Sequence, residues 1–238
     1  MMGTLLEIEQ VGKRYGGIMA IDGVSFTIGE RELVCVIGPN GAGKSSLLNV
    51  MSGTVRPDQG DVRFRGRSLR SQPAHAFANH GIVRKFQGAN VFPWMTVTDS
   101  LRMAGLGVAL HSGRAPPAVE DVLATIKLGH QAHRLGSMCS HGQRQWLEVG
   151  MTLMCRPRIL LLDEPTAGMT AVATVEMAEL ALRLAAEMSV VVIEHDMSFV
   201  RRLGCRTLVM HQGRLIADGP FDAVSHDERV RDAYLGRA

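Results

Sequence analysis

A glycine-rich segment between an apolar run and a helix-forming run constrains this chain more than any other feature. Val34-Cys35-Val36-Ile37 is continuously apolar, which is typical of a strand buried on both faces of a sheet. The chain then reads Gly38-x-x-x-x-Gly43-Lys44-Ser45, and a helical pattern follows from Lys44 to Met51. Strand, glycine-rich turn and helix, in this order, are the context in which such a segment binds phosphate groups. The sequence therefore predicts an α/β fold with a phosphate site at a strand end.

The residue types in this segment explain how it would hold phosphate. Glycines let successive backbone N–H groups converge on phosphate oxygens, where side chains would intrude. The helix N-terminus behind them favours negative charge. Lys44 would reach the terminal phosphates, and the hydroxyl of Ser45 would bind Mg²⁺. A plain glycine turn would not need the Lys-Ser pair in register, so we favour the phosphate site.

A second predicted buried strand ends in two carboxylates. Ile159-Leu160-Leu161-Leu162 precedes Asp163 and Glu164. Asp163 fits a direct or indirect partner of Mg²⁺. Glu164, one step further along, can polarise an attacking water. Four aliphatic residues followed by Asp-Glu occur often by chance, so this prediction depends on the glycine-rich segment upstream.

Ser140-His141-Gly142-Gln143 lies between these two motifs and begins a predicted helix. Its Ser-x-x-Gln spacing matches a capping box, in which the two side chains satisfy backbone N–H groups of the first turn. A helix start that offers a hydroxyl, a glycine N–H and the helix dipole is also an anion site. The structural and the functional interpretation are compatible here.

The remaining chain reads as a mostly parallel α/β core with a helical insertion. Strands are predicted at 5–11, 20–28, 32–37, 158–163, 189–194 and 207–211, and an amphipathic helix at 171–187. Between them, residues 98–106 and 117–128 have helical patterns, and apolar strands are missing. This stretch predicts a small helical lobe inserted in the sheet domain.

Composition limits the partners that the chain calls for. The net charge is only +3, so the composition does not indicate a nucleic-acid partner. We interpret the run Arg63, Arg65, Arg67 and Arg70 as the solvated side of a strand and loop. No apolar run approaches the roughly 20 residues that cross a bilayer, and no secretory signal is visible. The cysteines lack paired or metal-ligand spacing, which indicates structural thiols in a reducing cytoplasm.

Together these motifs resemble the ATP-binding subunits of ABC transporters, and the resemblance covers nearly the whole chain. It implies an α/β fold made of a phosphate-loop NTPase core with a mainly parallel sheet, an antiparallel β subdomain and an inserted helical lobe. The implied bounds are 1–86 and 157–238 for the catalytic core with its β subdomain, and 87–156 for the lobe. The implied activity is ATP hydrolysis coupled to solute transport.

The resemblance also implies an arrangement of two subunits. In that family two cassettes form a head-to-tail dimer with two ATP molecules between them, and each phosphate loop faces the signature motif of the opposite subunit. Ser140, His141, Gly142 and Gln143 would then act on ATP held by the partner.

Other roles follow by position in the family's motifs. Tyr15 matches the aromatic residue that stacks on adenine, Gln87 matches the glutamine that touches Mg²⁺, and His195 matches the histidine that contacts the γ-phosphate. The implied ATP-binding residues are Tyr15, Gly38, Pro39, Asn40, Gly41, Ala42, Gly43, Lys44, Ser45 and Ser46; the implied metal-binding residues are Ser45, Gln87 and Asp163; and the implied catalytic residues are Glu164 and His195.

Three positions depart from the family's usual pattern. His141 stands in place of a glycine, Cys139 in place of a leucine, and Thr170 where an aspartate usually helps couple the two sites. Residues 140–151, with 81–87 and 166–170, resemble urea-type uptake cassettes. The ending Ala233-Tyr234-Leu235-Gly236 resembles the wider class of branched-chain amino acid and amide importers. We predict urea or short amides as the solute, with branched-chain amino acids as the alternative.

The same resemblance implies partners and a location. The chain would work with a second cassette, as a hetero- or homodimer, with integral membrane permease subunits and, indirectly, with a solute-binding protein, and without nucleic acid. It would lie peripherally on the cytoplasmic side of the membrane. Residues 88–95 are unusually apolar for a loop. We expect them to receive a short helix of the membrane subunit, to pack locally through Phe92 and Trp94, or to do both.

Two other classes of protein share some of these motifs. Soluble cassette proteins of DNA repair or translation carry paired cassettes or long coiled coils, and this chain has neither. Phosphate-loop kinases and switch GTPases lack the Ser-x-Gly-Gln helix start, and a GTPase would need an Asn-Lys-x-Asp motif, which is absent from the sequence.

Overall fold

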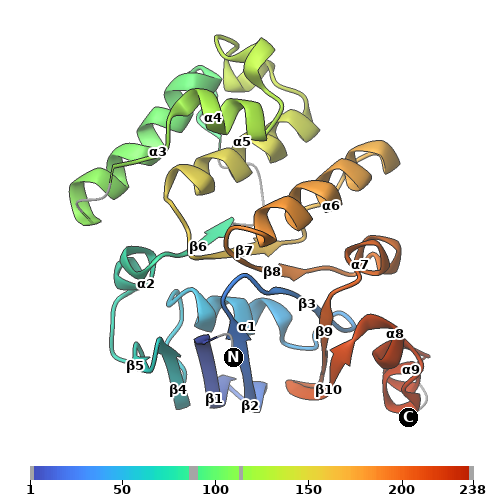
Figure 1. The fold of residues 1–238 in the computed structure, drawn as a ribbon. Helices are drawn as coiled ribbons and strands as arrows, with labels where there is room; N and C mark the ends of the chain where they lie inside the picture. Colours follow the sequence, from blue (N-terminus) through green and yellow to red (C-terminus); the bar gives the residue numbers. More distant parts are fainter. Residues whose placement is uncertain (1–2, 86–90, 113–114, 236–238) are drawn as a thin grey trace.

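The computed structural model describes residues 3–85, 91–112 and 115–235 of the chain. Figure 1 shows a large sheet across the middle of the molecule, a smaller sheet below it and a group of helices above it. The segments that form the large sheet come from both ends of the sequence, and the helical group comes from the middle. This arrangement matches the predicted sheet domain with a helical insertion.

The large sheet has six strands in the order β10-β9-β3-β8-β7-β6. Their bounds are β3 (Leu33–Ile37), β6 (Ile82–Lys85), β7 (Ile159–Asp163), β8 (Ser189–Ile193), β9 (Arg206–His211) and β10 (Arg214–Pro220). All neighbours pair in parallel except β10, which pairs antiparallel with β9. The carboxyl ends of β3, β7 and β8 therefore meet at one edge of the sheet.

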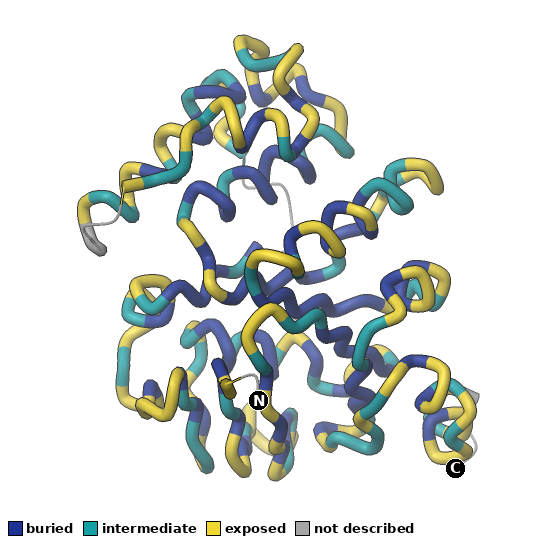
Figure 2. Tube along the Cα trace, viewed as in Figure 1, coloured by how far each residue is buried: buried dark blue, intermediate teal, exposed yellow. Residues whose placement is uncertain are grey.

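Both faces of the large sheet are covered, as the continuous apolar runs predict. In β3, Val34 and Val36 belong to one hydrophobic core and Cys35 and Ile37 to the other. Successive side chains of a strand point to opposite faces, so the two cores lie on opposite sides of the sheet. Figure 2 shows buried residues along the central strands and on the inner faces of the helices.

The small sheet is antiparallel, with strand order β2-β1-β4-β5. Its strands are β1 (Thr4–Tyr15), β2 (Ile18–Gly29), β4 (Gln59–Phe64) and β5 (Arg67–Ser68). Helix α1 (Lys44–Met51) contributes Leu47, Leu48 and Met51 to the core that the two sheets share. The antiparallel β part of the predicted fold is thus present.

Between β6 and β7 the described residues form helices and no strand. They are α3 (Val97–Ser112), α4 (Val119–Thr125), the short 3₁₀ turns η1 (Gly129–Gln131) and η2 (Gly136–Met138), and α5 (His141–Met154). Helix α4 is shorter than the predicted 117–128, because Pro117 precedes it and Lys127 adopts a left-handed φ of 56° after it. The exact bounds of the lobe, 87–156, stay a prediction.

The remaining helices flank the large sheet. They are α2 (Ala74–His80), α6 (Ala171–Ala185), α7 (Met197–Leu203), α8 (Phe221–Ser225) and α9 (Glu228–Leu235). Helix α6 buries Met177, Leu180 and Leu184 against the sheet and exposes Glu179 and Arg183, which agrees with the predicted amphipathic pattern.

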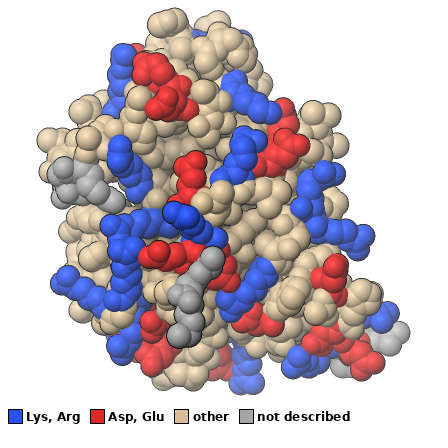
Figure 3. Space-filling model, viewed as in Figure 1, with Lys and Arg blue, Asp and Glu red and all other residues tan. Residues whose placement is uncertain are grey.

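The arginine run of the small sheet is a solvated, internally paired surface. Arg63 lies 3.0 Å from Glu9 and Arg65 lies 2.7 Å from Glu30. Figure 3 shows basic and acidic side chains interspersed over the visible face. The interpretation of this run as the exposed side of a strand and loop is confirmed for these residues.

Within the part of the chain that the structure describes, every helix is too short or too polar to span a membrane.

Candidate functional site

The glycine-rich segment Gly38–Ser45, called the phosphate loop below, joins β3 to α1. Gly38, Gly41 and Gly43 all have positive φ angles, of 151°, 80° and 99°. A Cβ at Gly38 would lie 2.2 Å from the carbonyl oxygen of Met210, and one at Gly43 would lie 2.2 Å from that of Ala20. The loop therefore requires glycine for backbone conformation and for space.

Helix α1 begins without a side-chain cap. Its N-cap residue is Gly43, and no side chain accepts a hydrogen bond from the first turn. The first N–H groups of a helix have no partner within the helix. Residues Lys44, Ser45 and Ser46 thus carry backbone donors at the positive end of the helix, next to the loop, where a phosphate group would be stabilised.

Lys44 lies over the loop that it would serve. Its ammonium group donates to the carbonyl oxygens of Gly38, at 2.7 Å, and Pro39, at 3.0 Å. The side chain is buried, and this burial lowers the pKa of Lys44, while the nearby carboxylates of Glu164 and Asp163 oppose the shift. A negatively charged phosphate group near this loop would stabilise the ammonium form.

Glu164 and His195 meet at the carboxyl edge of the large sheet. Asp163 pairs with Ile193 in the register of β7 and β8, so the residues that follow the two strands are neighbours. His195 Nδ1 lies 3.6 Å from Glu164 Oε1. Glu164 has a left-handed φ of 45°, an uncommon conformation for a non-glycine residue that recurs at functional sites. The two predicted catalytic side chains are thus brought together.

Asp163 has a buried partner that the sequence analysis missed. Arg84, in β6, donates to Asp163 Oδ2 at 2.7 Å, and both side chains are nearly inaccessible to solvent. Arg84 also donates to the side-chain oxygen of Asn49 in α1. The arginine therefore links β6, β7 and α1 directly behind the phosphate loop. The only sequence signal for it was its place three residues before Gln87.

A second missed carboxylate, Glu194, organises the loop after Glu164. Glu194 is fully buried, and its Oε1 accepts from the backbone N–H of Thr166 at 3.1 Å and from its hydroxyl at 2.6 Å. Its Oε2 accepts from the N–H of His195 at 3.1 Å. One carboxylate thus connects the end of β8 to residues 165–170, which we call the post-Glu164 loop.

The predicted capping box is present at the start of α5. Ser140 Oγ accepts from the N–H of Gln143 at 3.3 Å, and Gln143 Oε1 accepts from the N–H of Ser140 at 2.8 Å. Ser140 and His141 are exposed, and Gly142 and Gln143 are partly exposed. Residues 140–143, the signature segment, are therefore accessible at the surface of this chain.

Tyr15 lies at the end of β1, next to the turn of the β1–β2 hairpin. It is 43% exposed, and the ammonium group of Lys13 lies 5.6 Å from its ring centroid. The second strand of the hairpin touches the phosphate loop where the carbonyl oxygen of Ala20 faces Gly43. Gln87 lies outside the described residues.

Magnesium would have to bind here with help from the phosphate groups. No cluster of three His, Cys, Asp or Glu side chains that could hold a metal exists among the described residues. Mg²⁺ prefers oxygen ligands and commonly uses one or two protein groups together with substrate phosphates. The hydroxyl of Ser45 and the carboxylate of Asp163 are donors of this kind, so the residues present fit the ion.

The C-terminal helix also reaches the phosphate loop. Burial raises the pKa of Tyr234, in α9, to about 12, and the backbone N–H of Gly38 opposes this shift by hydrogen bonding to the phenol. Tyr234 belongs to the ending that the sequence analysis noted. Its contact with the first glycine of the loop links that ending to the site.

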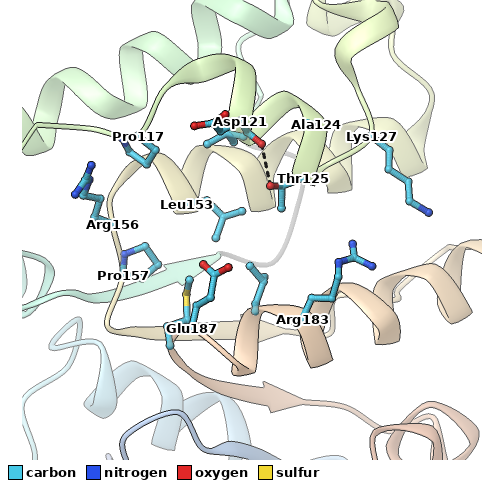
Figure 4. A pocket seen from close by; sticks show the side chains of 13 residues that line it. Pro117, Asp121, Ala124, Thr125, Lys127, Leu153, Arg156, Pro157, Arg183 and Glu187 are labelled. Atoms are coloured by element: carbon cyan, nitrogen blue, oxygen red, sulfur yellow. Dashed lines mark hydrogen bonds between the residues drawn. The ribbon is translucent and has the colours of Figure 1, made fainter.

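The cavity with a volume of about 790 Å³ lies elsewhere in the fold. Figure 4 shows it between α4 and the end of α5 above and the end of α6 below, with Asp121 and Thr125 on one side and Arg183 and Glu187 on the other. The residues that line it come from α4, α5, α6 and the neighbouring segments, and none of them belongs to the phosphate loop.

Comparison with known proteins identifies the family. The family model for ABC transporters matches residues 21–167. The chain belongs to this family. A second family model, for branched-chain amino acid ATP-binding cassette transporters, matches residues 214–238 of the cassette, which span β10, α8 and α9.

Relatives match the cassette over its full length. It is 36% identical over 255 residues to LivG of Salmonella typhimurium and 33% identical over 255 residues to BraF of Pseudomonas aeruginosa, both described as high-affinity branched-chain amino acid transport ATP-binding proteins. Each alignment covers 100% of both chains. Among solved structures, the ADP conformation of MJ1267, an ATP-binding cassette of an ABC transporter, matches with a TM-score of 0.86 and 29% identity, over 98% of this chain and 99% of that one.

These comparisons confirm the predicted fold class and the assignment as an ABC transporter ATPase. They do not support the prediction of a urea-type solute, because the relatives named above act in branched-chain amino acid transport. The alternative prediction fits them better.

Proposed function

We propose that this cassette is the ATP-hydrolysing subunit of an importer for branched-chain amino acids. The observation that carries the proposal is the match of residues 214–238 to the C-terminal family model of this transporter class. Full-length similarity to LivG and BraF supports the same class. The cassette itself holds ATP rather than the solute, so its own site residues do not distinguish one solute from another.

In this proposal the phosphate loop binds the phosphates of ATP. Lys44 would leave the carbonyl oxygens of Gly38 and Pro39, which hold its ammonium group now, and would pair with the terminal phosphates. The backbone donors of Lys44, Ser45 and Ser46 at the start of α1 add the helix dipole. Asn40 and Gly41 are exposed at the tip of the loop, where an incoming nucleotide meets it. Tyr15, exposed at the end of β1, would stack on the adenine.

Glu164 would orient the attacking water, and His195 would steady the charge that develops on the γ-phosphate. The 3.6 Å separation between the two side chains allows both to reach one reacting group. When bound, Mg²⁺ neutralises phosphate charge, and Ser45 and Asp163 would hold it, with Gln87 as a further ligand. Arg84 fixes the Asp163 carboxylate by a buried hydrogen bond and so limits how far that ligand can move.

The placement of the signature segment supports a dimer of two cassettes. The residues of 140–143 are at least partly exposed, and the helix start that they form is an anion site. We expect them to complete the ATP site of a second cassette, which is either an identical chain or a related one. Loss of the γ-phosphate would remove the charge that holds the two subunits closed.

The helical group and α6 face each other across the cleft of Figure 4, while elsewhere the helical group shares a hydrophobic core and the buried Lys85–Glu148 pair with the sheet. An ion pair between Lys127 and Glu176, at 2.8 Å, joins the two sides near this cleft, and its side chains are 50% and 38% exposed. An exposed ion pair contributes only about 0.2–1 kcal/mol. We therefore propose that residues 87–156 act as a lobe that rotates on the core of residues 1–86 and 157–238.

An apolar hollow marks the surface that would contact the membrane subunit. It has a volume of about 220 Å³ and lies between β6, α3 and α5. Phe92 and Trp94, in the loop before α3, are 41% and 78% exposed, so they do not fill a local core. A short helix of a permease docking here would place the cassette on the cytoplasmic side of the membrane.

Uptake measurements test the proposed solute. A strain lacking this cassette would be complemented with the wild-type chain or with the matched control Glu164→Gln, and uptake of radiolabelled leucine and urea would be compared. Leucine uptake that depends on the wild-type chain, and not on the control, is the expected result. Urea uptake restored without leucine uptake would refute the branched-chain assignment and favour the urea-type alternative.

A further inference from the structure

His141, the residue that stands in place of the usual glycine, directs its imidazole ring at its own chain. Nε2 of His141 lies 3.1 Å from the carbonyl oxygen of Ala167, in the post-Glu164 loop. Gln145, one turn further along α5, donates from its side-chain amide to the same oxygen at 3.4 Å. The start of α5 and the loop thus share one acceptor, although 26 residues separate His141 from Ala167.

The contact defines which ring nitrogen carries the proton. A carbonyl oxygen only accepts hydrogen bonds, so the short contact is favourable only when Nε2 of His141 is protonated. If Nε2 instead accepted from Gln145, which is 3.4 Å away, its lone pair would face the oxygen of Ala167. We therefore assign the hydrogen to Nε2, and the carbonyl oxygen uses its two lone pairs for His141 and Gln145.

Gly168 leaves the space that the ring occupies. Its φ angle is +71°, and a Cβ built there would lie 2.9 Å from Nε2 and 3.2 Å from Cδ2 of His141. Atoms this close would force the ring or the backbone to shift. The histidine at position 141 and the glycine at position 168 are therefore fitted to each other.

The other end of the loop is held as well. Thr166 bonds twice to the buried carboxylate of Glu194, and Glu194 also accepts from the backbone of His195. The hydrogen bonds therefore run from His195, at the end of β8, through the post-Glu164 loop to His141, at the start of α5. A segment tied at both ends moves with the elements that hold it.

We infer that His141 is a positioning residue that fixes the start of α5 to the post-Glu164 loop. The signature segment and the loop would then move together as one unit. A glycine at position 141 would lack this bond. The effect on ATP turnover rests on the proposed function, because both segments are expected to face the ATP of the partner; the contact itself does not depend on it.

A double-mutant cycle tests the contact in the full chain without ATP. Gly168→Ala should shift the unfolding equilibrium about tenfold more in the wild-type background than in the His141→Gly background, which corresponds to about 1.4 kcal/mol of coupling. Urea denaturation measures both shifts. Equal shifts in the two backgrounds would show that the ring does not pack on Gly168 and would overturn the inference.

Hydrogen exchange keeps the test decisive if Gly168→Ala does not fold. Backbone amides of residues 166–169 should exchange several-fold faster in His141→Ala than in the wild-type chain, because the loop loses one of its two anchors. The matched control is His130→Ala, which removes an exposed histidine in η1. Among the described residues, the ring of His130 has a hydrogen-bond contact with the neighbouring Gln131 amide and none with the post-Glu164 loop. Unchanged exchange in His141→Ala would contradict the inference.

Turnover by the assembled transporter tests the role of the contact. His141→Ala should lower kcat about tenfold and leave the KM for ATP unchanged, since a displaced group costs rate more than binding. His141→Gln should recover most of the rate, because its amide can donate to the same carbonyl oxygen. Equal loss in both variants, or no loss in either, would overturn the positioning role. Absence of ATP hydrolysis in the wild-type assembly would instead refute the proposed function. The double-mutant cycle of positions 141 and 168 would still test the contact, because it is measured without ATP.

Discussion

The ion pair between Lys85 and Glu148 allows the sharpest prediction about stability. Lys85 is the last residue of β6, and Glu148 lies in the middle of α5, so the pair joins the sheet to the helical group. Their side chains are 2% and 7% exposed, and the charged atoms are 3.0 Å apart. Two unit charges at this distance interact by about 5–6 kcal/mol at an effective dielectric constant of about 20.

Removing one partner leaves a buried charge without its counterpart. Glu148→Leu leaves the Lys85 side chain, which is only 2% exposed, without its counter-charge, and we expect a loss of about 3–5 kcal/mol in the free energy of unfolding. For a chain of this length the loss corresponds to a fall of roughly 10 °C in Tm. The double variant Lys85→Met/Glu148→Leu removes both charges and should recover most of the loss, because the desolvation penalty disappears together with the attraction.

Urea denaturation followed by circular dichroism measures the wild-type chain, the single variant and the double variant. Lys127→Met is the matched control, because it breaks an exposed lysine–glutamate pair and should cost less than about 1 kcal/mol. A Glu148→Leu variant as stable as this control would show that the pair is not buried in solution. A double variant as unstable as the single one would show that packing, rather than charge, explains the loss.

Three further predictions concern the site and its surroundings. Burial lowers the pKa of Lys44 and phosphate would raise it, so ATP binding should take up protons at alkaline pH, between the lowered pKa and the ordinary value near 10.5. In the same pH window the nucleotide-free chain should become more stable as pH rises, because the unfolded chain binds more protons there than the folded chain. Calorimetry in two buffers with different ionisation enthalpies measures this uptake, and equal binding enthalpies in both buffers would contradict it. Gly43→Ala should abolish binding of a fluorescent ATP analogue, because the added Cβ would lie 2.2 Å from the carbonyl oxygen of Ala20; retained affinity would show that the loop has another conformation. Trp94→Ala should change the free energy of unfolding by less than about 0.5 kcal/mol, since the side chain is 78% exposed, and should weaken co-purification with the permease subunits; a large loss of stability would place Trp94 in a core instead.

The parts of the fold that the sequence predicted are those with local signals. The apolar runs of β3, β7 and β8 identify strands covered on both faces, and the glycines before Lys44 identify the turn between β3 and α1. The capping box at Ser140 was readable because both of its members lie within one helical turn. In each case neighbouring residues contain the whole signal.

The parts that could not be predicted depend on residues far apart in the sequence. Strand β6 reads Ile82-Val83-Arg84-Lys85, and its two charged residues hide its character as a strand of the large sheet. Arg84 bonds to Asp163, 79 residues away, and Lys85 pairs with Glu148 in α5. Charged side chains are buried only when such partners exist, and only the fold brings the partners together.

The solute was the weakest prediction for a different physical reason. The residues that suggested a urea-type cassette, His141 among them, belong to segments that are expected to face ATP rather than the solute. His141 in fact faces Ala167 of the same chain. The histidine in place of glycine in the signature segment therefore indicates a contact within the cassette and not the identity of the solute. The transported molecule has to be inferred from relatives.

We propose that Glu164 directs water at ATP held by a closed pair of cassettes. The most direct measurement is the rate of ATP hydrolysis by the assembled transporter with Glu164→Gln, together with ATP binding by the same variant. We predict unchanged ATP affinity and a kcat lower by at least about 100-fold, because the amide cannot accept a proton from water. Hydrolysis near the wild-type rate would contradict it.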